Sequence, residues 1–357
     1  MAMSGGIDSS VAAILLKEQG YELVGATYRT FDGISRECLA KEKGCCSVDS
    51  IMEARRMAHD MGFEHHIIDL RQTFRESVIA DFIDEYLHGR TPNPCVVCNS
   101  EIKWGKLQQV ADSLGCDYIA TGHYARISTD ETGRFFLRKG VDAHKDQTYF
   151  LWRLTQENLS RTLFPLGEMT KAEVRAVAAA HGYVKLSRKS ESQEICFIPD
   201  NDYRHFLASN VESYAERYGE GYFVDTDGNV LGRHKGYPNY TIGQRKGLGI
   251  ALGRPVYVVR IEPKTNRVVL GEREDLLSRS CRIKRVNMMK MADFIDGMEV
   301  MAKMRYKSRP GLATIWHDGD GIRVDFREPM ESVTPGQSAV LYGGDGWQDV
   351  LCAGVIC

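Results

Sequence analysis

The sequence predicts an α/β domain with a doubly wound parallel sheet, then a small central β-rich domain, then a C-terminal β-barrel. From Ser9 to about Leu186, helical and strand patterns alternate, which is typical of βαβ units. After Pro199 the pattern changes to short β-like runs separated by Gly, Asn and Pro. We therefore expect domains at residues 1–200, 201–279 and 280–357.

Each segment of the first domain follows one of these periodicities. SSVAAILLKEQG predicts a helix closed by Gly20, and VDSIMEARRMAHDMG predicts an amphipathic helix that ends at Gly62. YELVGATY, EHHIIDL and DYIATGHY predict strands. Because ligands of a doubly wound sheet lie beyond the carboxyl ends of its strands, we expect Gly122 and His123 beside a ligand. We expect no catalytic role for His123 or Tyr124.

The β-rich part of the chain falls into two groups of strands. YFVDTDGNVLGRHKG and RPVYVVRIEPKTNRVVLG belong to the central domain. MEVMAKMRYKS, ATIWHDGDGIRVDF and SAVLYGGDG follow from about Ser280, with the spacing of a small barrel or sandwich.

Charge is distributed unevenly along the chain. The 357 residues carry a net charge of −2, yet residues 231–310 hold 18 Lys or Arg against 7 Asp or Glu, which makes this stretch +11 and the rest −13. Such asymmetry favours contact with nucleic acid, although a basic face that only keeps the protein soluble has the same composition. With no apolar run long enough for a membrane span and no secretion signal, we expect a cytoplasmic protein.

A glycine- and serine-rich loop, SGGIDSS at Ser4 to Ser10, stands directly before the first helix. Glycines let the backbone approach phosphate oxygens, and the helix N-terminus favours an anion. The loop lacks the Walker lysine and resembles the pyrophosphate loop of enzymes that split ATP into AMP and pyrophosphate. Only three residues precede it, so we expect a first strand that is cut short or continues upstream, and a more stable protein when the N-terminus is extended.

Ten cysteines in a chain without a secretion signal favour reduced thiols, catalytic groups or metal ligands over disulfides. Cys95 and Cys98 form a C-x-x-C pair before a helix expected to begin near Asn99, and a helix N-terminus lowers the pKa of a thiol. By itself the pair fits a zinc half-site, a redox pair, iron–sulfur ligands or chance. The absence of a second C-x-x-C weakens four-thiolate zinc.

Nearly end to end, the sequence resembles the tRNA-specific 2-thiouridylases, which replace the 2-oxygen of the wobble uridine with sulfur. The motifs that carry the resemblance are AMSGGIDSS, GRTPNPCVVCNSEIKWG, TGHYARI, KDQTYFLWRL, FPLGEMTKAEVR, SQEICFIP, YTIGQRKGLGI, RYKSRP and VTPGQSAVLY. The resemblance implies a first domain of the adenine nucleotide alpha-hydrolase type, in which ATP, accompanied by Mg²⁺, activates the uridine by adenylylation.

The resemblance also implies the residues that bind ATP. Tyr28, where family members usually have Met, and Gly122 contribute around the adenosine. The implied loop contacts are Ala2, Met3, Ser4, Gly5, Gly6, Ile7, Asp8 and Ser9.

By the same resemblance, Cys196 carries a persulfide received from a cysteine desulfurase or a sulfur-relay protein, and Cys98 is its partner thiol. Sulfur transfer then leaves a Cys98–Cys196 disulfide that a reductant reopens. Many members have Asp where this chain has Cys95. The alternative to the favoured persulfide route is therefore a 4Fe-4S cluster on Cys95, Cys98 and Cys196, whose open iron would bind sulfide.

The RNA contacts come partly from the resemblance and partly from charge. Arg245 and Lys246 lie in the basic stretch, and we expect them on the RNA backbone. The contacts that the resemblance implies are Asn93, Pro94 and Cys95 at the target base and, elsewhere, Lys145, Asp146, Gln147, Arg305 and Tyr306.

Two other functions stay open at this point. A pyrophosphate-loop ligase that acts on a small molecule would need neither the basic stretch nor the paired thiols. A non-catalytic tRNA-binding protein would not need the intact phosphate loop, Cys98 or Cys196.

Overall fold

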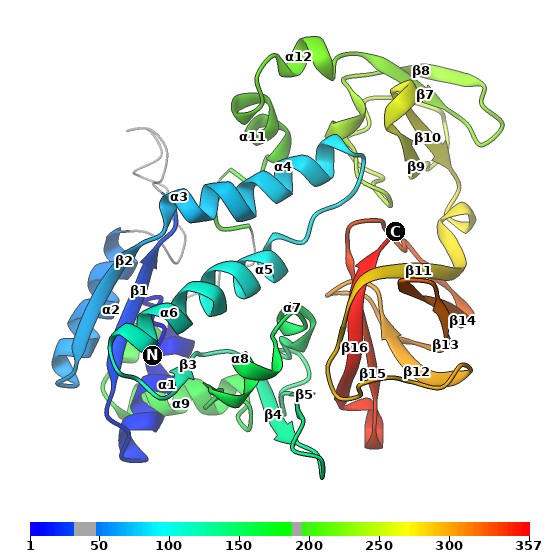
Figure 1. Ribbon diagram of the computed structural model, residues 1–357. Coiled ribbons are helices and arrows are strands. Elements are labelled where there is room, and N and C mark those ends of the chain that lie inside the picture. Colours follow the sequence, from blue (N-terminus) through cyan, green and yellow to red (C-terminus); the bar gives the residue numbers. More distant parts are fainter. Residues whose placement is uncertain (32–47, 188–194, 199) are drawn as a thin grey trace. The chain divides into compact units, whose positions relative to one another are not determined.

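The computed structural model describes residues 1–31, 48–187, 195–198 and 200–357 (Figure 1). The expected domain change at Pro199 lies outside the described residues. The described chain forms two compact units, and each is presented by itself. The first unit comprises Met1–Val78, Cys95–Asn201 and Gln348–Leu351, and the second comprises Ile79–Pro94, Asp202–Trp347 and Cys352–Cys357.

The first unit is built on a parallel sheet of short strands (Figure 1). Strands β1 and β2 pair in parallel, as do β3 and β6. The first residues of the chain join the two pairs, because Met3 donates its N–H to the Ala26 carbonyl and Ala2 donates to the Ala120 carbonyl, both at 2.8 Å. The parallel α/β architecture expected from the sequence is thereby confirmed. The strands are β1 (Val24–Arg29), β2 (Glu64–Asp69), β3 (Ile119–Ala120) and β6 (Thr162–Leu163).

Helix α1 (Ile7–Glu18) is buried on two sides. Its Ile7 and Val11 pack with residues of helix α9 (Lys171–Ala180), whereas its Ile14 packs with residues of helix α2 (Val48–Asp60). Burial on both sides explains why the helix is mostly apolar and why its orientation is fixed. The other helices of this unit are α3 (Arg71–Phe74), α6 (Gly105–Ser113), α7 (Thr148–Leu151), α8 (Gln156–Ser160) and α10 (Val184–Ser187).

The ends of α1 and α2 lie where the sequence predicts them. One strand and one connection differ from the prediction. Gly20 and Gly62 follow α1 and α2 with φ of +87° and +71°, which is the conformation that favours glycine after a helix. The strand expected from DYIATGHY covers only β3, since the chain turns away beyond Ala120. An antiparallel hairpin of β4 (Ala125–Thr129) and β5 (Phe135–Lys139) then interrupts the expected βα alternation.

The expectation that a helix begins near Asn99 is wrong. Helical structure begins at Pro94 and continues without a break through α5 (Pro94–Val97), a π-helical segment η3 (Cys98–Trp104) and α6. Proline is well suited to the first turn of a helix because its missing N–H has no partner there in any case. Cys95, and not Cys98, therefore stands at the start of the helix.

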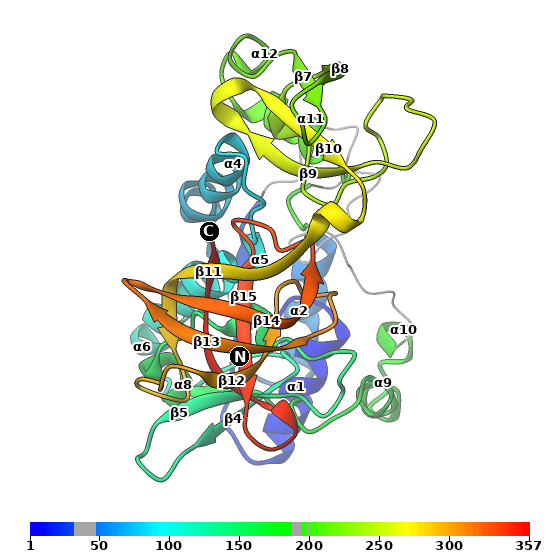
Figure 2. The same cartoon turned by 90° about the vertical axis from the view of Figure 1, so that its right-hand side faces the viewer.

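The second unit contains a four-stranded sheet in the order β8, β7, β10, β9 (Figure 2). Its core is a cluster of buried aromatic and aliphatic side chains that includes Phe223, Tyr240 and Val258. The strands are β7 (Gly221–Val224), β8 (Val230–His234), β9 (Tyr257–Glu262) and β10 (Arg267–Gly271). The helices of this unit are α4 (Ala80–Leu87), α11 (Tyr203–Asn210) and α12 (Tyr214–Arg217).

Six strands form a closed barrel in the order β11, β14, β13, β12, β15, β16, and pairing of β11 with β16 closes it. Closure removes the exposed edges of the sheet. The expected C-terminal barrel is confirmed. Its strands are β11 (Leu277–Met288), β12 (Met298–Lys303), β13 (Gly311–Asp318), β14 (Gly321–Glu331), β15 (Ser338–Gly343) and β16 (Asp349–Ile356). Among the described residues, the helices are all too short or too polar to cross a membrane.

Candidate active site

The phosphate loop folds back on itself at the start of α1. The Ser4 N–H donates to Ser9 Oγ at 3.1 Å, and the Ser9 hydroxyl donates to the Gly6 carbonyl at 3.1 Å. Gly5 has φ +65°, and a Cβ there would lie 2.2 Å from the Ser50 carbonyl oxygen, so only glycine fits. No side chain caps α1, which leaves the first N–H groups of the helix for an anion.

Gly122 lets the end of β3 approach this loop. A Cβ on Gly122 would lie 2.6 Å from the Asp8 carbonyl carbon and 2.7 Å from the Ser9 nitrogen. Any side chain at this position would therefore push the first turn of α1 away from the sheet. The structure thus places Gly122 against the phosphate loop, and its expected contact with the adenosine stays a prediction.

The Asp8 carboxylate is held by two donors that the sequence analysis did not identify. The Tyr124 hydroxyl donates to Asp8 Oδ1 at 2.6 Å, and the Lys171 ammonium donates to the same oxygen at 2.7 Å. The Lys171 ammonium also lies 5.7 Å from the centre of the Tyr124 ring. The three side chains come from α1, from the segment between β3 and β4, and from the first turn of α9.

Cys98 belongs to the same unit as Tyr28, which the resemblance assigned to the adenosine. Burial raises the pKa of the Tyr28 hydroxyl well above its usual value, and the charge of a Cys98 thiolate raises it further. The unit that contains the phosphate loop thus also contains this predicted thiol and the residue predicted at the adenosine.

Lys103 and His123 are neighbours, and the charge of Lys103 also acts on the Cys95 thiol. Burial around the sulfur raises the pKa of the Cys95 thiol. The positive charge of Lys103 lowers that pKa and so partly offsets the effect of burial. Lys103 Nζ lies 3.5 Å from His123 Nε2, and His123 Nδ1 lies 2.7 Å from Thr121 Oγ1. Burial and the Lys103 charge lower the pKa of His123 well below its usual value, so His123 is neutral near pH 7.

Cys196 is exposed in the short described segment at residues 195–198, where the neighbouring Phe197 packs edge to face against Phe74 at 5.7 Å. The first three residues and the last residue of the SQEICFIP motif lie outside the described part. Among the described residues, no group of three or more Cys, His, Asp or Glu side chains is placed to hold a metal. As they are arranged here, Cys95, Cys98 and Cys196 do not fit a common cluster.

The predicted RNA contacts at Lys145, Asp146 and Gln147 differ in exposure. Lys145 is half-buried, whereas Asp146 is 5% exposed and accepts hydrogen bonds from Thr148 Oγ1 at 3.0 and 2.8 Å. The Gln147 side chain accepts the N–H of Tyr124 at 2.9 Å. In this structure Asp146 and Gln147 stabilise the turn that presents Tyr124, and an RNA contact by them stays a prediction.

Within the second unit, the segment before Cys95 is fastened to the end of the barrel. Asn93 Nδ2 donates to Ser338 Oγ at 3.4 Å. Gln337 Nε2 donates to the carbonyls of Thr91 and Pro92 at 3.1 and 2.7 Å. Asn93, predicted to contact the target base, therefore lies in an ordered segment.

Arg305 and Tyr306 follow strand β12 in the second unit. One terminal nitrogen of Arg305 donates to the Ile242 carbonyl at 3.0 Å and also to the Thr334 hydroxyl. The Lys303 ammonium lies 5.3 Å from the centre of the Tyr306 ring. Arg305 thus holds the loop that carries Arg245 and Lys246, both of which are exposed.

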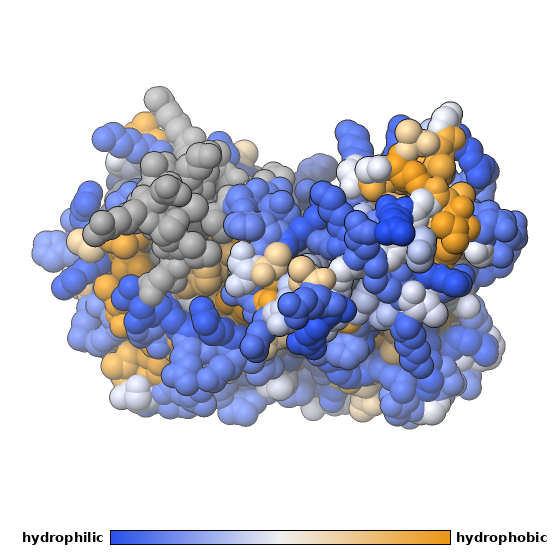
Figure 3. Space-filling view, turned by 90° about the horizontal axis from the view of Figure 1, so that it is seen from above, coloured by the Kyte–Doolittle hydropathy of each residue, from blue (hydrophilic) through white to orange (hydrophobic). Residues whose placement is uncertain are grey.

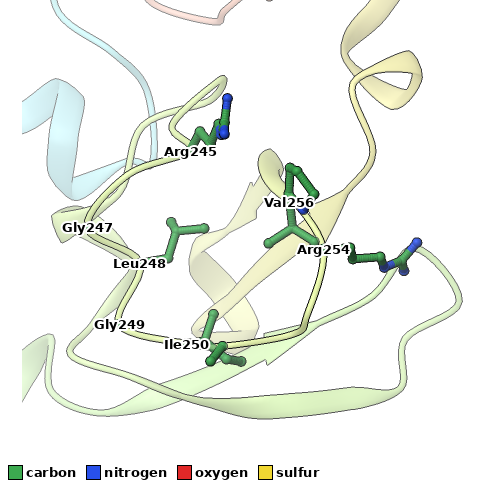
Figure 4. Close-up of a pocket in the computed structure, with 9 residues that line it drawn as sticks. Arg245, Gly247, Leu248, Gly249, Ile250, Arg254 and Val256 are labelled. Carbon is green, nitrogen blue, oxygen red and sulfur yellow. The ribbon is translucent and has the colours of Figure 1, made fainter.

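The loop at residues 245–256 encloses a pocket with a volume of about 390 Å³ (Figure 4). Leu248, Ile250 and Val256 point into it, and the Arg245 and Arg254 side chains point outward from its rim. The face in Figure 3 is largely hydrophilic, with hydrophobic groups at its left side and at its upper right. The pocket is thus lined by both polar and apolar groups, with two arginines at its rim.

Comparisons with known proteins cover the whole chain. The matching family models are the tRNA methyl transferase HUP domain at residues 1–200, the tRNA methyl transferase PRC-barrel domain at residues 204–272 and the aminomethyltransferase beta-barrel domain at residues 278–356.

Curated relatives match at high identity over nearly their entire length. The tRNA-specific 2-thiouridylase MnmA of Amoebophilus asiaticus is 51% identical, with 100% of this chain and 94% of the relative covered. The protein with the same description in Cytophaga hutchinsonii is 50% identical, with 100% and 96% covered. The one in Clostridioides difficile is 47% identical, with 97% and 94% covered.

We predict that Gly122→Ala lowers ATP affinity by about 10- to 100-fold, because the added methyl group displaces the start of α1 by a fraction of an ångström or more. Titration calorimetry with a non-hydrolysable ATP analogue measures this. The matched control is Gly232→Ala, whose new methyl group meets only the flexible end of Ile250. ATP affinity equal to that of the unmodified protein would show that the loop tolerates the displacement.

Lys103→Met should raise the pKa of the Cys95 thiol further, because it removes the cation that favours the thiolate. At a fixed pH, alkylation of Cys95 by iodoacetamide then becomes slower, as followed by mass spectrometry of the peptide that contains it. Lys106→Met is the control, since that ammonium bonds Gln109. An unchanged alkylation rate in Lys103→Met would contradict an effect of the Lys103 charge on the Cys95 thiol.

Proposed function

The chain belongs to the family of tRNA-specific 2-thiouridylases, and on that premise we propose that it uses ATP to replace the 2-oxygen of the wobble uridine of tRNA with sulfur. The enzyme is a tRNA sulfurtransferase. The observation that supports the proposal is that one unit contains both the phosphate loop, whose helix N-terminus has no side-chain cap, and the two predicted sulfur-handling thiols, Cys98 and Cys196.

Sulfur can replace the 2-oxygen of the wobble uridine only after that oxygen has been converted into a leaving group. In the proposed first step, the uridine 2-oxygen attacks the α-phosphorus of ATP, the α–β bond breaks, pyrophosphate leaves and the base loses its N3 proton. The glycines of the loop and the uncapped N-terminus of α1 favour this site for the phosphates. The proposed ATP contacts are the ones named above from Ala2 to Ser9, with Tyr28 and Gly122.

Magnesium fits one position in this site. Mg²⁺ prefers carboxylate oxygens, and Asp8 is 34% exposed at the first turn of α1. When bound, the ion neutralises charge that develops on pyrophosphate. Asp8 is the residue that we propose to hold it.

The second step delivers sulfur. A persulfide on Cys196 attacks C2 of the base, the C2–O bond breaks and AMP leaves with that oxygen. The Cys98 thiolate then attacks the Cys196 sulfur, the S–S bond breaks and the base keeps the outer sulfur. Alternatively Cys98 first releases sulfide from the persulfide, and the sulfide attacks C2. Either order leaves a Cys98–Cys196 disulfide, and a thiol reductant supplies two electrons to reopen it.

The persulfide sulfur comes from outside the chain. We propose a cysteine desulfurase or a sulfur-relay protein as the donor and the cytoplasm as the site of the reaction. The exposure of Cys196 supports delivery by a partner protein, because a buried thiol could not be reached.

We also propose a division of labour among residues 1–200, 201–279 and 280–357, in which the first range performs the chemistry and the other two bind tRNA. The excess positive charge of residues 231–310 and the exposure of Arg245 and Lys246 support this. A wobble base lies in a single-stranded loop, so it can be turned out toward Asn93, Pro94 and Cys95. The remaining proposed contacts are Lys145, Asp146, Gln147, Arg305 and Tyr306.

Cys196→Ser should abolish formation of 2-thiouridine with a sulfur-relay donor while pyrophosphate release in the first turnover persists, because the serine cannot carry a persulfide. Nucleoside mass spectrometry and a pyrophosphate assay separate the two steps. Cys357→Ser, at another exposed cysteine, is the control. Full thiolation by Cys196→Ser would remove the persulfide role, and iron with visible absorption in an anaerobic preparation would favour the cluster instead.

Arg245→Met should reduce the slope of log affinity for tRNA against log salt by about one, because it removes one phosphate contact, while ATP affinity stays unchanged. The control is Arg233→Met, since that guanidinium pairs with Glu220 at 3.0 Å. Filter binding at several salt concentrations measures the slope. An unchanged slope in Arg245→Met would exclude the proposed backbone contact.

A further inference from the structure

The phosphate loop lacks the lysine that Walker loops carry, yet a lysine from elsewhere in the chain reaches it. Lys171 stands at the start of α9, 163 residues beyond Asp8, and its side chain is 10% exposed. Neither the loop motif nor the charge distribution of the sequence indicates this pair. Lys171 therefore supplies a positive charge to the loop from a distant part of the chain.

Helix α9 holds Lys171 in place from several directions. Thr170 and Glu173 form a capping box that fixes the first turn of the helix. The Lys171 N–H donates to Asp142 Oδ2 at 3.0 Å. Val174 of α9 packs in the same buried cluster as Ile7 of α1, so the two helices move together. The ammonium therefore meets Asp8 with little freedom.

The two donors to Asp8 meet the same oxygen. The Lys171 ammonium and the Tyr124 hydroxyl both bond Oδ1, at 2.7 and 2.6 Å. Within the described part of the chain, Asp8 Oδ2 has no donor, and the side chain is partly open to solvent. The carboxylate is thus fixed through one oxygen and leaves the other available to a ligand.

We propose that Lys171 and Tyr124 are positioning residues of the phosphate loop: they hold Asp8 through Oδ1 so that Oδ2 faces a divalent cation bound together with the triphosphate. The inference rests on the proposed function in taking ATP as the triphosphate. Carboxylates that bind metal ions are commonly oriented by a hydrogen-bond partner, and loss of that partner weakens metal binding. The lysine also offsets part of the negative charge that gathers at the loop.

A purely structural ion pair is a poor explanation of the same geometry. Removing a lysine ammonium from water costs free energy that one ion pair does not reliably recover, and an apolar residue often serves stability better. Tyr124 would likewise not need its hydroxyl if it served only to pack against Ile7 and Leu166 in the buried cluster. Both polar groups are explained by orientation of Asp8.

The test compares Lys171→Met, Lys171→Arg and Tyr124→Phe with the control Lys185→Met, which changes an exposed lysine of α10. Binding of a non-hydrolysable ATP analogue is titrated against Mg²⁺ concentration, without tRNA. We expect Lys171→Met to raise the Mg²⁺ concentration for half-maximal binding by about 10- to 100-fold. Tyr124→Phe should cause a smaller rise, Lys171→Arg should recover part of the loss, and Lys185→Met should change nothing.

Melting temperature shows whether each variant is folded. Folded Lys171→Met or Tyr124→Phe with the Mg²⁺ dependence of the unmodified protein would overturn the proposal. If Lys171→Met does not fold, Tyr124→Phe decides the proposal by the same criterion.

The test of the positioning role can succeed or fail independently of the proposed function. If the unmodified protein forms no 2-thiouridine but Lys171→Met shows the shifted Mg²⁺ dependence, the proposed function fails and the positioning role stands. If thiolation occurs and the Mg²⁺ dependence does not shift, the positioning role fails alone.

Discussion

The close approach of the end of β3 to the start of α1 is the constraint on which the site depends. Gly122 permits it, because any Cβ there would overlap the backbone at Asp8 and Ser9. The same approach brings Tyr124, two residues after Gly122, within hydrogen-bond distance of Asp8. Sheet, helix and loop are therefore fixed as one structure, and the phosphate site is prepared before a ligand arrives.

This rigidity has a chemical purpose in the proposed reaction. An activated uridine is open to attack by water, so nucleotide and sulfur must be brought together with little freedom. The unbroken helical segment from Pro94 to Ser113 carries Cys95, Cys98 and Lys103 on one element. Its π-helical part begins at Cys98, and irregular turns of this kind are frequent at functional sites. The Cys98 thiol is thus presented by a helical element and not by a loop.

The sequence predicted what depends on local pattern. Helical periodicity and glycine signals located α1 and α2, and the phosphate loop was recognised from Ser4 to Ser10 because its glycines and serines are contiguous. The short β3 was overestimated, since a pattern of apolar residues does not show where pairing ends. The predicted helix start near Asn99 lies five residues too late, because a proline is common both in loops and in the first turn of a helix.

The sequence could not have predicted what depends on contacts between distant residues. Lys171 lies in an ordinary-looking helix start, and only the packing of α9 against α1 brings it to Asp8. Lys103 and His123 are likewise joined by the fold. The resemblance implied that Asp146 contacts tRNA, whereas the fold buries its carboxylate against Thr148.

The central claim is that ATP activates the 2-oxygen of the uridine and that AMP removes it. The most direct measurement uses tRNA with ¹⁸O at the 2-position of the wobble uridine, incubated with the protein, ATP and a persulfide donor, followed by mass spectrometry of AMP and nucleosides. The account predicts one ¹⁸O atom in each AMP and an equal amount of 2-thiouridine. Thiolation accompanied by unlabelled AMP would contradict it.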